Sequence, residues 1–142
     1  MIVKYERKTV MEITKGRCCV YGIEYHIVLC TKYRSKVITP NVEKRLHELL
    51  YEFAKNSDFE ILTMNGEEDH VHLLVSATPS TIIPNVIKGM KGVSARMLLK
   101  DFPEIKDKLY GGHLWSPSYF ICTVSENTEA NIKNYIESQK DK

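Results

Sequence analysis

The sequence lacks several features that would place it in a specialised class of protein. Its 142 residues include only 7 glycines, 5 prolines and a single tryptophan, and no low-complexity segment or interdomain linker stands out. No stretch approaches the roughly 18 apolar residues of a membrane-spanning helix. The N-terminus also has no apolar run of the kind found in secretory signals. We therefore expect a cytoplasmic protein without a membrane partner.

Charge and cysteine content are equally unremarkable. The 20 basic and 18 acidic residues leave a net charge of +2, which does not by itself indicate nucleic-acid binding. Four cysteines occur without any Cys-x-x-Cys spacing, so a structural zinc site is not expected. The remaining signal lies in the pattern of the 43% hydrophobic residues, which are enough for the core of one compact domain.

This pattern predicts an α+β fold. Residues rich in β-branched and aromatic types predict strands over 21–31, 59–64, 69–77 and 114–124. Apolar residues at helical spacing, with capping residues before them, predict helices from Thr39, over 81–101 and over 129–139. The dipeptide Asn65-Gly66 predicts a hairpin turn between the second and third strands.

The order of these elements matches a known arrangement. Strand-helix-strand-strand-helix-strand is the split β-α-β, ferredoxin-like order, an antiparallel four-stranded sheet with two helices on one face. A C-terminal helix follows it. We expect residues 1–20 to form an N-terminal arm and residues 21–142 to form the single domain. The other face of the sheet would then be available for a site.

The segment Asp69-His70-Val71-His72-Leu73-Leu74-Val75 carries the first chemical signal. Side chains two apart on a strand share a face, with Cα atoms about 6.6 Å apart, so His70 and His72 can converge on one divalent ion. The alternating apolar residues would pack toward the helices, and Asp69 would point away from the histidines on a regular strand. A histidine pair that binds no metal is the alternative interpretation.

Two histidines rarely suffice for a metal site, so a third ligand is needed. Gln139 on the last helix is a candidate, and Tyr135 lies about 6 Å before it on the same helical face. A phenol, with a pKa near 10, becomes a useful nucleophile when a cation or base favours the phenolate. Ordinary packing of Tyr135 on the helix surface is the alternative.

The chain resembles the single-tyrosine HUH transposases of small insertion sequences, in which HUH stands for His-hydrophobic-His. The resemblance covers about residues 21–140 and consists of several segments in the right order. These segments are Tyr25-His26-Ile27-Val28, Lys32-Tyr33-Arg34, Asp69-His70-Val71-His72-Leu73-Leu74, Lys91-Gly92-Val93-Ser94-Ala95-Arg96, Leu114-Trp115-Ser116-Pro117-Ser118-Tyr119-Phe120 and Asn134-Tyr135-Ile136 with Gln139.

The resemblance implies a reaction. Members of the family bind a divalent cation, usually Mg²⁺ or Mn²⁺, through the positions of His70, His72 and Gln139, and they need no nucleotide cofactor. The tyrosine, here Tyr135, attacks single-stranded DNA, forms a 5′-phosphotyrosine link and releases a 3′-hydroxyl. Joining two ends needs two tyrosines, so the resemblance implies a homodimer. Whether Tyr135 serves the histidine pair of its own chain or of the partner is left open.

The resemblance also implies recognition of DNA hairpins at the ends of the element. We expect basic side chains to contact the phosphates and aromatic rings to stack on unpaired bases. Core packing is the alternative for the aromatic residues. The candidates are Lys32, Arg34, Lys36, Lys88, Lys91 and Arg96 for the phosphates and Tyr33, Trp115 and Tyr119 for the bases.

Three other functions remain open at this point. One is a nucleic-acid-binding module without catalysis, although the Gly-Phe pattern of RNA-recognition sheets is absent. Another is a domesticated HUH endonuclease that acts on chromosomal hairpin repeats. The third is a metal-dependent phosphodiesterase that uses water as its nucleophile, with Tyr135 uninvolved.

Overall fold

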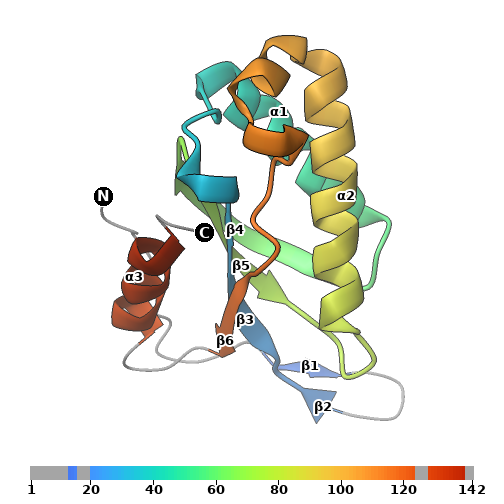
Figure 1. The fold of residues 1–142 in the computed structure, drawn as a ribbon. Coiled ribbons are helices and arrows are strands. Elements are labelled where there is room, and N and C mark those ends of the chain that lie inside the picture. The colour runs from blue at the N-terminus through green and yellow to red at the C-terminus, as the bar shows by residue number, and fades with distance from the viewer. Residues whose placement is uncertain (1–12, 16–19, 124–127, 140–142) are drawn as a thin grey trace.

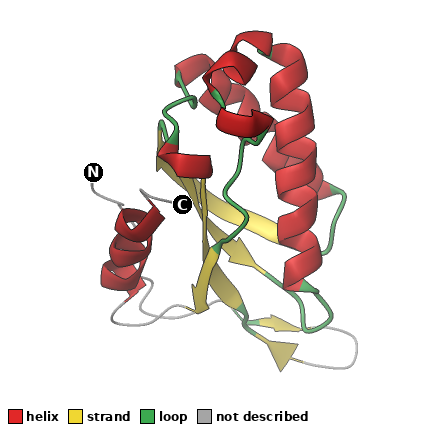
Figure 2. Cartoon of the chain, viewed as in Figure 1, coloured by secondary structure: helices red, strands yellow, loops and turns green. Residues whose placement is uncertain are grey.

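The structure is a computed structural model that describes residues 13–15, 20–123 and 128–139. Four antiparallel strands form the main sheet in the order β4-β5-β3-β6 (Figure 1). Two helices cover one face, and a third lies on the other face (Figures 1 and 2). The elements are β3 Glu24–Cys30, α1 Pro40–Lys55, β4 Glu60–Glu67, β5 His70–Ser76, α2 Ile83–Asp101, β6 Phe120–Thr123 and α3 Thr128–Ser138.

This arrangement confirms the predicted α+β, split β-α-β fold. The helices α1 and α2 begin with prolines in their first turns, where the missing N–H costs nothing. Within residues 13–15, 20–123 and 128–139, no helix is both long and apolar enough to cross a membrane.

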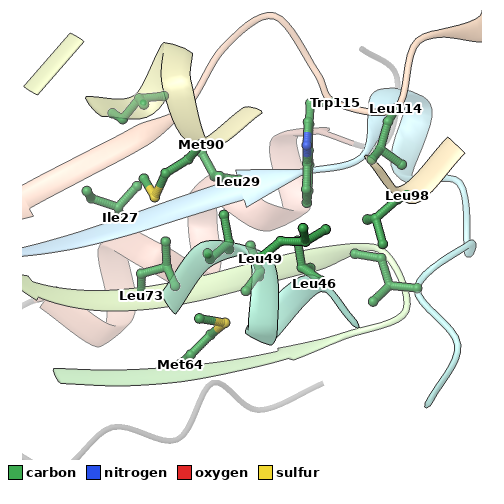
Figure 3. Packing of buried hydrophobic residues seen from close by; sticks show 14 of the residues in the cluster. Ile27, Leu29, Leu46, Leu49, Met64, Leu73, Met90, Leu98, Leu114 and Trp115 are labelled. Carbon is green, nitrogen blue, oxygen red and sulfur yellow. The ribbon is translucent and has the colours of Figure 1, made fainter. Parts of the chain in front are cut away.

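The main core lies between the sheet and the helices α1 and α2. Alternate residues of β3 and β5 point into it, among them Ile27, Leu29 and Leu73, which are fully buried. Figure 3 shows these side chains packed with Leu46 of α1 and other apolar residues from α2 and β4. The other residues of β3 and β5 therefore face α3.

The opposite face has a smaller apolar cluster under α3. Ile132 and Ile136 of α3 are buried against Val28 and Cys30 of β3. Burial raises the pKa of the Cys30 thiol to about 12, with a further contribution from the nearby charge of Asp69. Cys30 is therefore a buried thiol, as its position in an apolar strand suggests.

Most of the predicted N-terminal arm, residues 1–20, lies outside the described residues. Two short pieces of this region are described, β1 Thr14–Lys15 and β2 Val20–Tyr21, which pair as an antiparallel ladder.

The prediction of a turn at Asn65-Gly66 is wrong. Strand β4 continues through both residues to Glu67, and the turn is made by Glu68 and Asp69. Gly66 pairs with Val71 of β5, where a Cβ would collide with the main-chain carbonyl oxygen of His70. The glycine therefore allows two strands to approach closely rather than reversing the chain.

The predicted strand over 114–124 is shorter than expected. Of its described residues, 114–123, only Phe120–Thr123 joins the sheet, while Trp115 makes a single antiparallel bridge to Thr31. Residue 124 of the predicted strand lies outside the described residues. Pro117 between them has no N–H to donate to a ladder. Residues 116–119 form instead a loop that reaches the helix α3 through hydrogen bonds.

Two glycine substitutions should change stability in opposite directions. Gly66→Ala would place a Cβ against main chain that cannot move away, and we expect a loss of about 1–3 kcal/mol in unfolding free energy. Gly92→Ala, at an exposed position of α2 with nothing within 4 Å, should gain up to about 1 kcal/mol from helix propensity. Urea denaturation of both variants measures the difference, and equal effects would contradict this account.

Candidate metal and nucleophile site

The pairing of β3 with β5 gathers three histidines on the sheet face that α3 covers. His72 pairs with Val28 and His70 pairs with Cys30, and these four residues share one face because paired residues point the same way. His26, two residues before Val28, lies on the same face. All three imidazoles are buried, at 0 to 2% exposure. The predicted face for His70 and His72 is therefore the one that the structure has.

His70 is held by a charged side chain next to it. Its Nδ1 lies 2.8 Å from Oδ1 of Asp69. Oδ2 of Asp69 accepts a hydrogen bond from Nε of Arg34 at 2.9 Å and forms an ion pair with Nη2 of Arg34 at 2.8 Å. Burial opposes the charge of Asp69, but the hydrogen bond from His70 and the Arg34 guanidinium hold the pKa of its carboxyl below the usual value. The expectation that Asp69 points away from the histidines is wrong, because Asp69 lies in the turn before β5 begins.

His72 has a different partner. Its Nε2 lies 2.9 Å from Nδ1 of His26, and the two rings stack with centroids 5.1 Å apart. Burial lowers the pKa of both groups to about 4, and His26 and His70 lower that of His72 further by charge repulsion. Both rings are therefore neutral at pH 7, which is the protonation state of a histidine that binds metal.

One ring nitrogen of His70 and one of His72 are suited to bind a metal ion. Nε2 of His70 and Nδ1 of His72 are buried and have no hydrogen-bond partner within the described residues. A buried nitrogen without a partner is costly, and a cation would relieve that cost at both atoms. No group of three His, Cys, Asp or Glu side chains in the described part of the chain could hold an ion.

Tyr135 of α3 and Gln139, which directly follows α3, both contact one loop. Ser116 and Ser118 each donate a hydrogen bond to Oε1 of Gln139 at 3.2 Å, and Oγ of Ser118 lies 3.0 Å from the hydroxyl of Tyr135. Gln139 is buried, and Tyr135 is half-buried and packs against Phe120. The two side chains are side by side, as their spacing predicts.

The phenol of Tyr135 is protonated at neutral pH in this arrangement. Burial raises its pKa, and the hydrogen bond with Ser118 offsets part of that shift. Neither Tyr135 nor Gln139 is hydrogen-bonded to His70 or His72, whose ring nitrogens are accounted for above. The structure thus places both pairs on one side of the sheet without a hydrogen bond between them.

Three of the expected DNA contacts have partners inside the protein. Arg34 forms the ion pair with Asp69, and its side chain is only 14% exposed. The ammonium of Lys91 donates to the main-chain carbonyls of Ser116 and Ser118 at 2.7 and 2.8 Å, and burial lowers its pKa. Trp115 is 7% exposed and donates its indole N–H to Ser94, so core packing is correct for this residue (Figure 3).

The other candidates lie nearer to the surface. Tyr33 is 45% exposed, at the edge of the Tyr110 ring, with the ammonium of Lys32 5.6 Å from its ring centre. Tyr119 is half-buried beside Lys91. Among the basic candidates for phosphate contacts, Lys36, Lys88 and Arg96 are exposed.

Sequence reasoning missed the partners of the expected site residues. His26 precedes His70 and His72 by more than forty positions, and only its alternation with Val28 in a predicted strand signals its face. Ser116 and Ser118 flank a proline in a segment that reads as strand. Their contacts depend on how α3 docks, which no local pattern encodes.

Acid should destabilise the metal-free protein through His26 and His72. Their pKa of about 4 in the folded protein lies below the value of 6.5 expected in the unfolded chain. Between these values the unfolded chain binds more protons, so the unfolding free energy falls as pH falls, by up to about 1.4 kcal/mol per pH unit for each group. His26→Asn retains a polar partner for His72 and removes one such group. We therefore expect it to lose less stability than wild type between pH 7 and pH 4.5.

Urea denaturation in EDTA at the two pH values provides the measurement. His113→Asn, at an exposed position, is the matched control and should lose as much stability as wild type. An equal loss in His26→Asn and wild type would contradict this account, because it would mean that the pKa of His26 is the same in the folded protein and in the unfolded chain.

Comparison with known proteins identifies relatives along almost the whole chain. The protein is 50% identical over 132 residues to the ISDra2 transposase TnpA of Deinococcus radiodurans, a match that covers 93% of this chain and 94% of the relative. It is 29% identical over 119 residues to the transposase for insertion sequence element IS200 of Salmonella typhimurium, covering 84% of this chain and 78% of that one.

Solved structures agree with these matches. A crystal structure of a transposase from Deinococcus radiodurans superimposes with a TM-score of 0.84 at 44% identity and covers 89% of this chain and 97% of that chain. A REP-associated tyrosine transposase bound to a REP hairpin gives a TM-score of 0.56 at 10% identity, covering 98% and 76%, which is a likeness of fold alone. The family model described as "Transposase IS200 like" matches residues 19–139, and the chain belongs to that family.

Proposed function

We propose that this transposase cleaves and rejoins single-stranded DNA at the ends of an insertion sequence, with Tyr135 as the nucleophile. The observation that carries the proposal is that α3 brings Tyr135 and Gln139 to the sheet face that holds His70 and His72. A histidine pair, an amide and a phenol on one face are the groups that such a reaction needs. In this proposal residues 21–142 act as one catalytic unit in the cytoplasm, where the DNA is.

His70, His72 and Gln139 would hold the divalent cation, Mg²⁺ or Mn²⁺. The ion supplies Lewis-acid polarisation of the scissile phosphate and favours the phenolate of a nearby tyrosine. All three ligands are neutral, so the site keeps the full positive charge of the ion for the anionic substrate. Oε1 of Gln139 would have to leave the hydroxyls of Ser116 and Ser118 in order to bind.

The covalent step conserves the energy of the phosphodiester. The oxygen of Tyr135 bonds to phosphorus, the bond from phosphorus to the 3′ oxygen breaks, and that oxygen leaves as a 3′-hydroxyl after taking a proton from water. The phenolic proton of Tyr135 passes to water. Attack by a 3′-hydroxyl on the 5′-phosphotyrosine reverses these changes, so no nucleotide cofactor is required.

A homodimer is part of the proposal. Each chain contributes one nucleophile, and joining two DNA ends requires two. Tyr135 and Gln139 are both hydrogen-bonded to Ser118, and neither is hydrogen-bonded to His70 or His72 of the same chain. Either α3 shifts when DNA binds, or the partner's helix supplies the nucleophile in trans.

DNA would run along the surface residues that have no strong internal partner. Lys32 and Lys36 are the phosphate contacts nearest to His70, because they flank the Arg34 turn, and Lys88 and Arg96 extend the basic surface onto α2. Tyr33 offers an exposed ring for a base, and Tyr119 a half-buried one. Stacking on these rings requires unpaired bases, and single-stranded DNA with hairpin ends would supply them.

Covalent trapping tests the nucleophile. We expect wild-type protein with Mg²⁺ and single-stranded DNA from the ends of the element to give an adduct that migrates as protein plus DNA in denaturing gels. Tyr135→Phe should give none, because it lacks the attacking oxygen. Tyr51→Phe is the matched control, since Tyr51 is 43% exposed on α1, on the opposite side of the sheet. Adduct formation by Tyr135→Phe would overturn the assignment.

The same assay separates the rival functions. A binding module without catalysis would retain DNA but form no adduct and show no response to EDTA. A phosphodiesterase that uses water would release cleaved DNA with no link to protein. A domesticated relative would form the adduct only on chromosomal hairpin repeats, so both DNA substrates belong in the experiment.

A further inference from the structure

Asp69 links a surface turn to one of the two histidines through its two carboxylate oxygens. Oδ1 faces Nδ1 of His70 at 2.8 Å, while Oδ2 faces two nitrogens of Arg34 at 2.8 and 2.9 Å. The side chain of Asp69 is 8% exposed and that of His70 is fully buried. Both oxygens of the carboxylate are therefore committed, each to a different residue.

The main chain around this contact is also fixed. The backbone N–H and the hydroxyl of Thr31 both donate to the carbonyl oxygen of Asp69, at 3.0 and 3.1 Å. Arg34 reaches Asp69 from a 3-10 turn in which Tyr33 and Arg34 adopt left-handed backbone angles, with φ of 57° and 52°. Such angles are unfavourable for these residues, so the ion pair and the turn hydrogen bonds must hold them.

The arrangement has a consequence for the tautomer of His70. A carboxylate only accepts hydrogen bonds, so Nδ1 of His70 must carry the proton. In a neutral imidazole Nε2 then has a bare lone pair, and this is the buried atom that has no partner in the described part of the chain. Asp69 thus selects the form of His70 that presents Nε2 as a ligand.

We propose that Asp69, fixed by Arg34, is a positioning residue that holds His70 in the Nδ1-protonated tautomer with Nε2 directed to the metal. Arg34 then belongs to the metal site and not to the DNA-binding surface. The inference rests on the proposed metal site only for the identity of the ligand. The tautomer itself is a property of the metal-free protein.

Asp69→Asn is the decisive variant. The guanidinium of Arg34 demands an acceptor, so the new side chain should turn its oxygen to Arg34 and its NH₂ group to His70. Nδ1 must then accept, and the proton moves to Nε2, the atom that would bind the ion. Nitrogen-15 NMR of ring-labelled histidines in metal-free protein reads the tautomer, with the His70 signals assigned by their loss in His70→Gln.

The second measurement is Mn²⁺ affinity without DNA, by titration calorimetry or electron paramagnetic resonance. We expect Asp69→Asn to bind Mn²⁺ 10–100-fold more weakly than wild type, as for other partners of metal-binding histidines. Arg34→Gln keeps the carboxylate, so the tautomer should stay Nδ1-protonated while Mn²⁺ binding weakens several-fold. This variant also tests the proposal should Asp69→Asn fail to fold.

Matched controls are available on the opposite side of the molecule. Arg45 and Asp101 form an ion pair with the same 2.8 Å contact between α1 and α2, with both side chains about one-third exposed. Arg45→Gln and Asp101→Asn should change neither the tautomer of His70 nor Mn²⁺ affinity. A phosphate-contact role for Arg34 predicts that Arg34→Gln weakens DNA binding alone.

The outcomes separate this inference from the function on which it rests. Unchanged tautomer in Asp69→Asn, or Mn²⁺ affinity within two-fold of wild type in both variants, would overturn the role of Asp69 and Arg34. A wild-type protein that binds no Mn²⁺ would overturn the metal site of the proposed function, and with it the direction of Nε2 toward an ion. Neither result changes the expectation that Tyr135→Phe forms no covalent adduct.

Discussion

The antiparallel pairing of β3 with β5 decides which residues reach the core and which reach the site. Cys30 opposite His70 and Val28 opposite His72 fix a register in which both histidines face α3. The side-chain period of a strand is two, so a slip of one residue would turn the histidines into the core under α1 and α2 and expose Leu73 to α3. The packing of the apolar layer that stabilises the domain therefore also fixes the register that directs His70 and His72 toward α3.

Polar groups on this face are kept neutral or paired. His26 and His72 avoid the cost of buried charge by remaining unprotonated, with a pKa of about 4. The charge of Asp69, which contacts His70, is matched by Arg34 in a contact that is largely buried. Removing either member of such a pair costs more than the pair contributes, because the other charge would stay buried without compensation. Because His26 and His72 are uncharged and the carboxylate of Asp69 is paired with Arg34, these two imidazoles would not repel a bound cation.

Periodicity predicted most of the strands and helices, the face of the histidine pair and the proximity of Tyr135 to Gln139, because each of these follows from the repeat of a single element. It failed where two elements meet. Gly66 resembles a turn residue, yet it serves the close approach of β4 to β5. Arg34 resembles a surface cation, yet it pairs across thirty-five positions with Asp69. Residue type alone cannot separate these uses, since they depend on distances that only the assembled sheet creates.

The hydroxyl of Ser118 links the side chains of Tyr135 and Gln139. It donates its single proton to Oε1 of Gln139, so it must accept from the hydroxyl of Tyr135. The phenol therefore keeps its proton as long as Ser118 serves Gln139. The ammonium of Lys91 donates hydrogen bonds to the main-chain carbonyls of Ser116 and Ser118, and it therefore holds in place the loop that carries the Ser118 hydroxyl. If Gln139 leaves to bind an ion, Ser118 can donate to the phenolate oxygen instead, and the same hydrogen bond that kept Tyr135 protonated would then stabilise its ionised form.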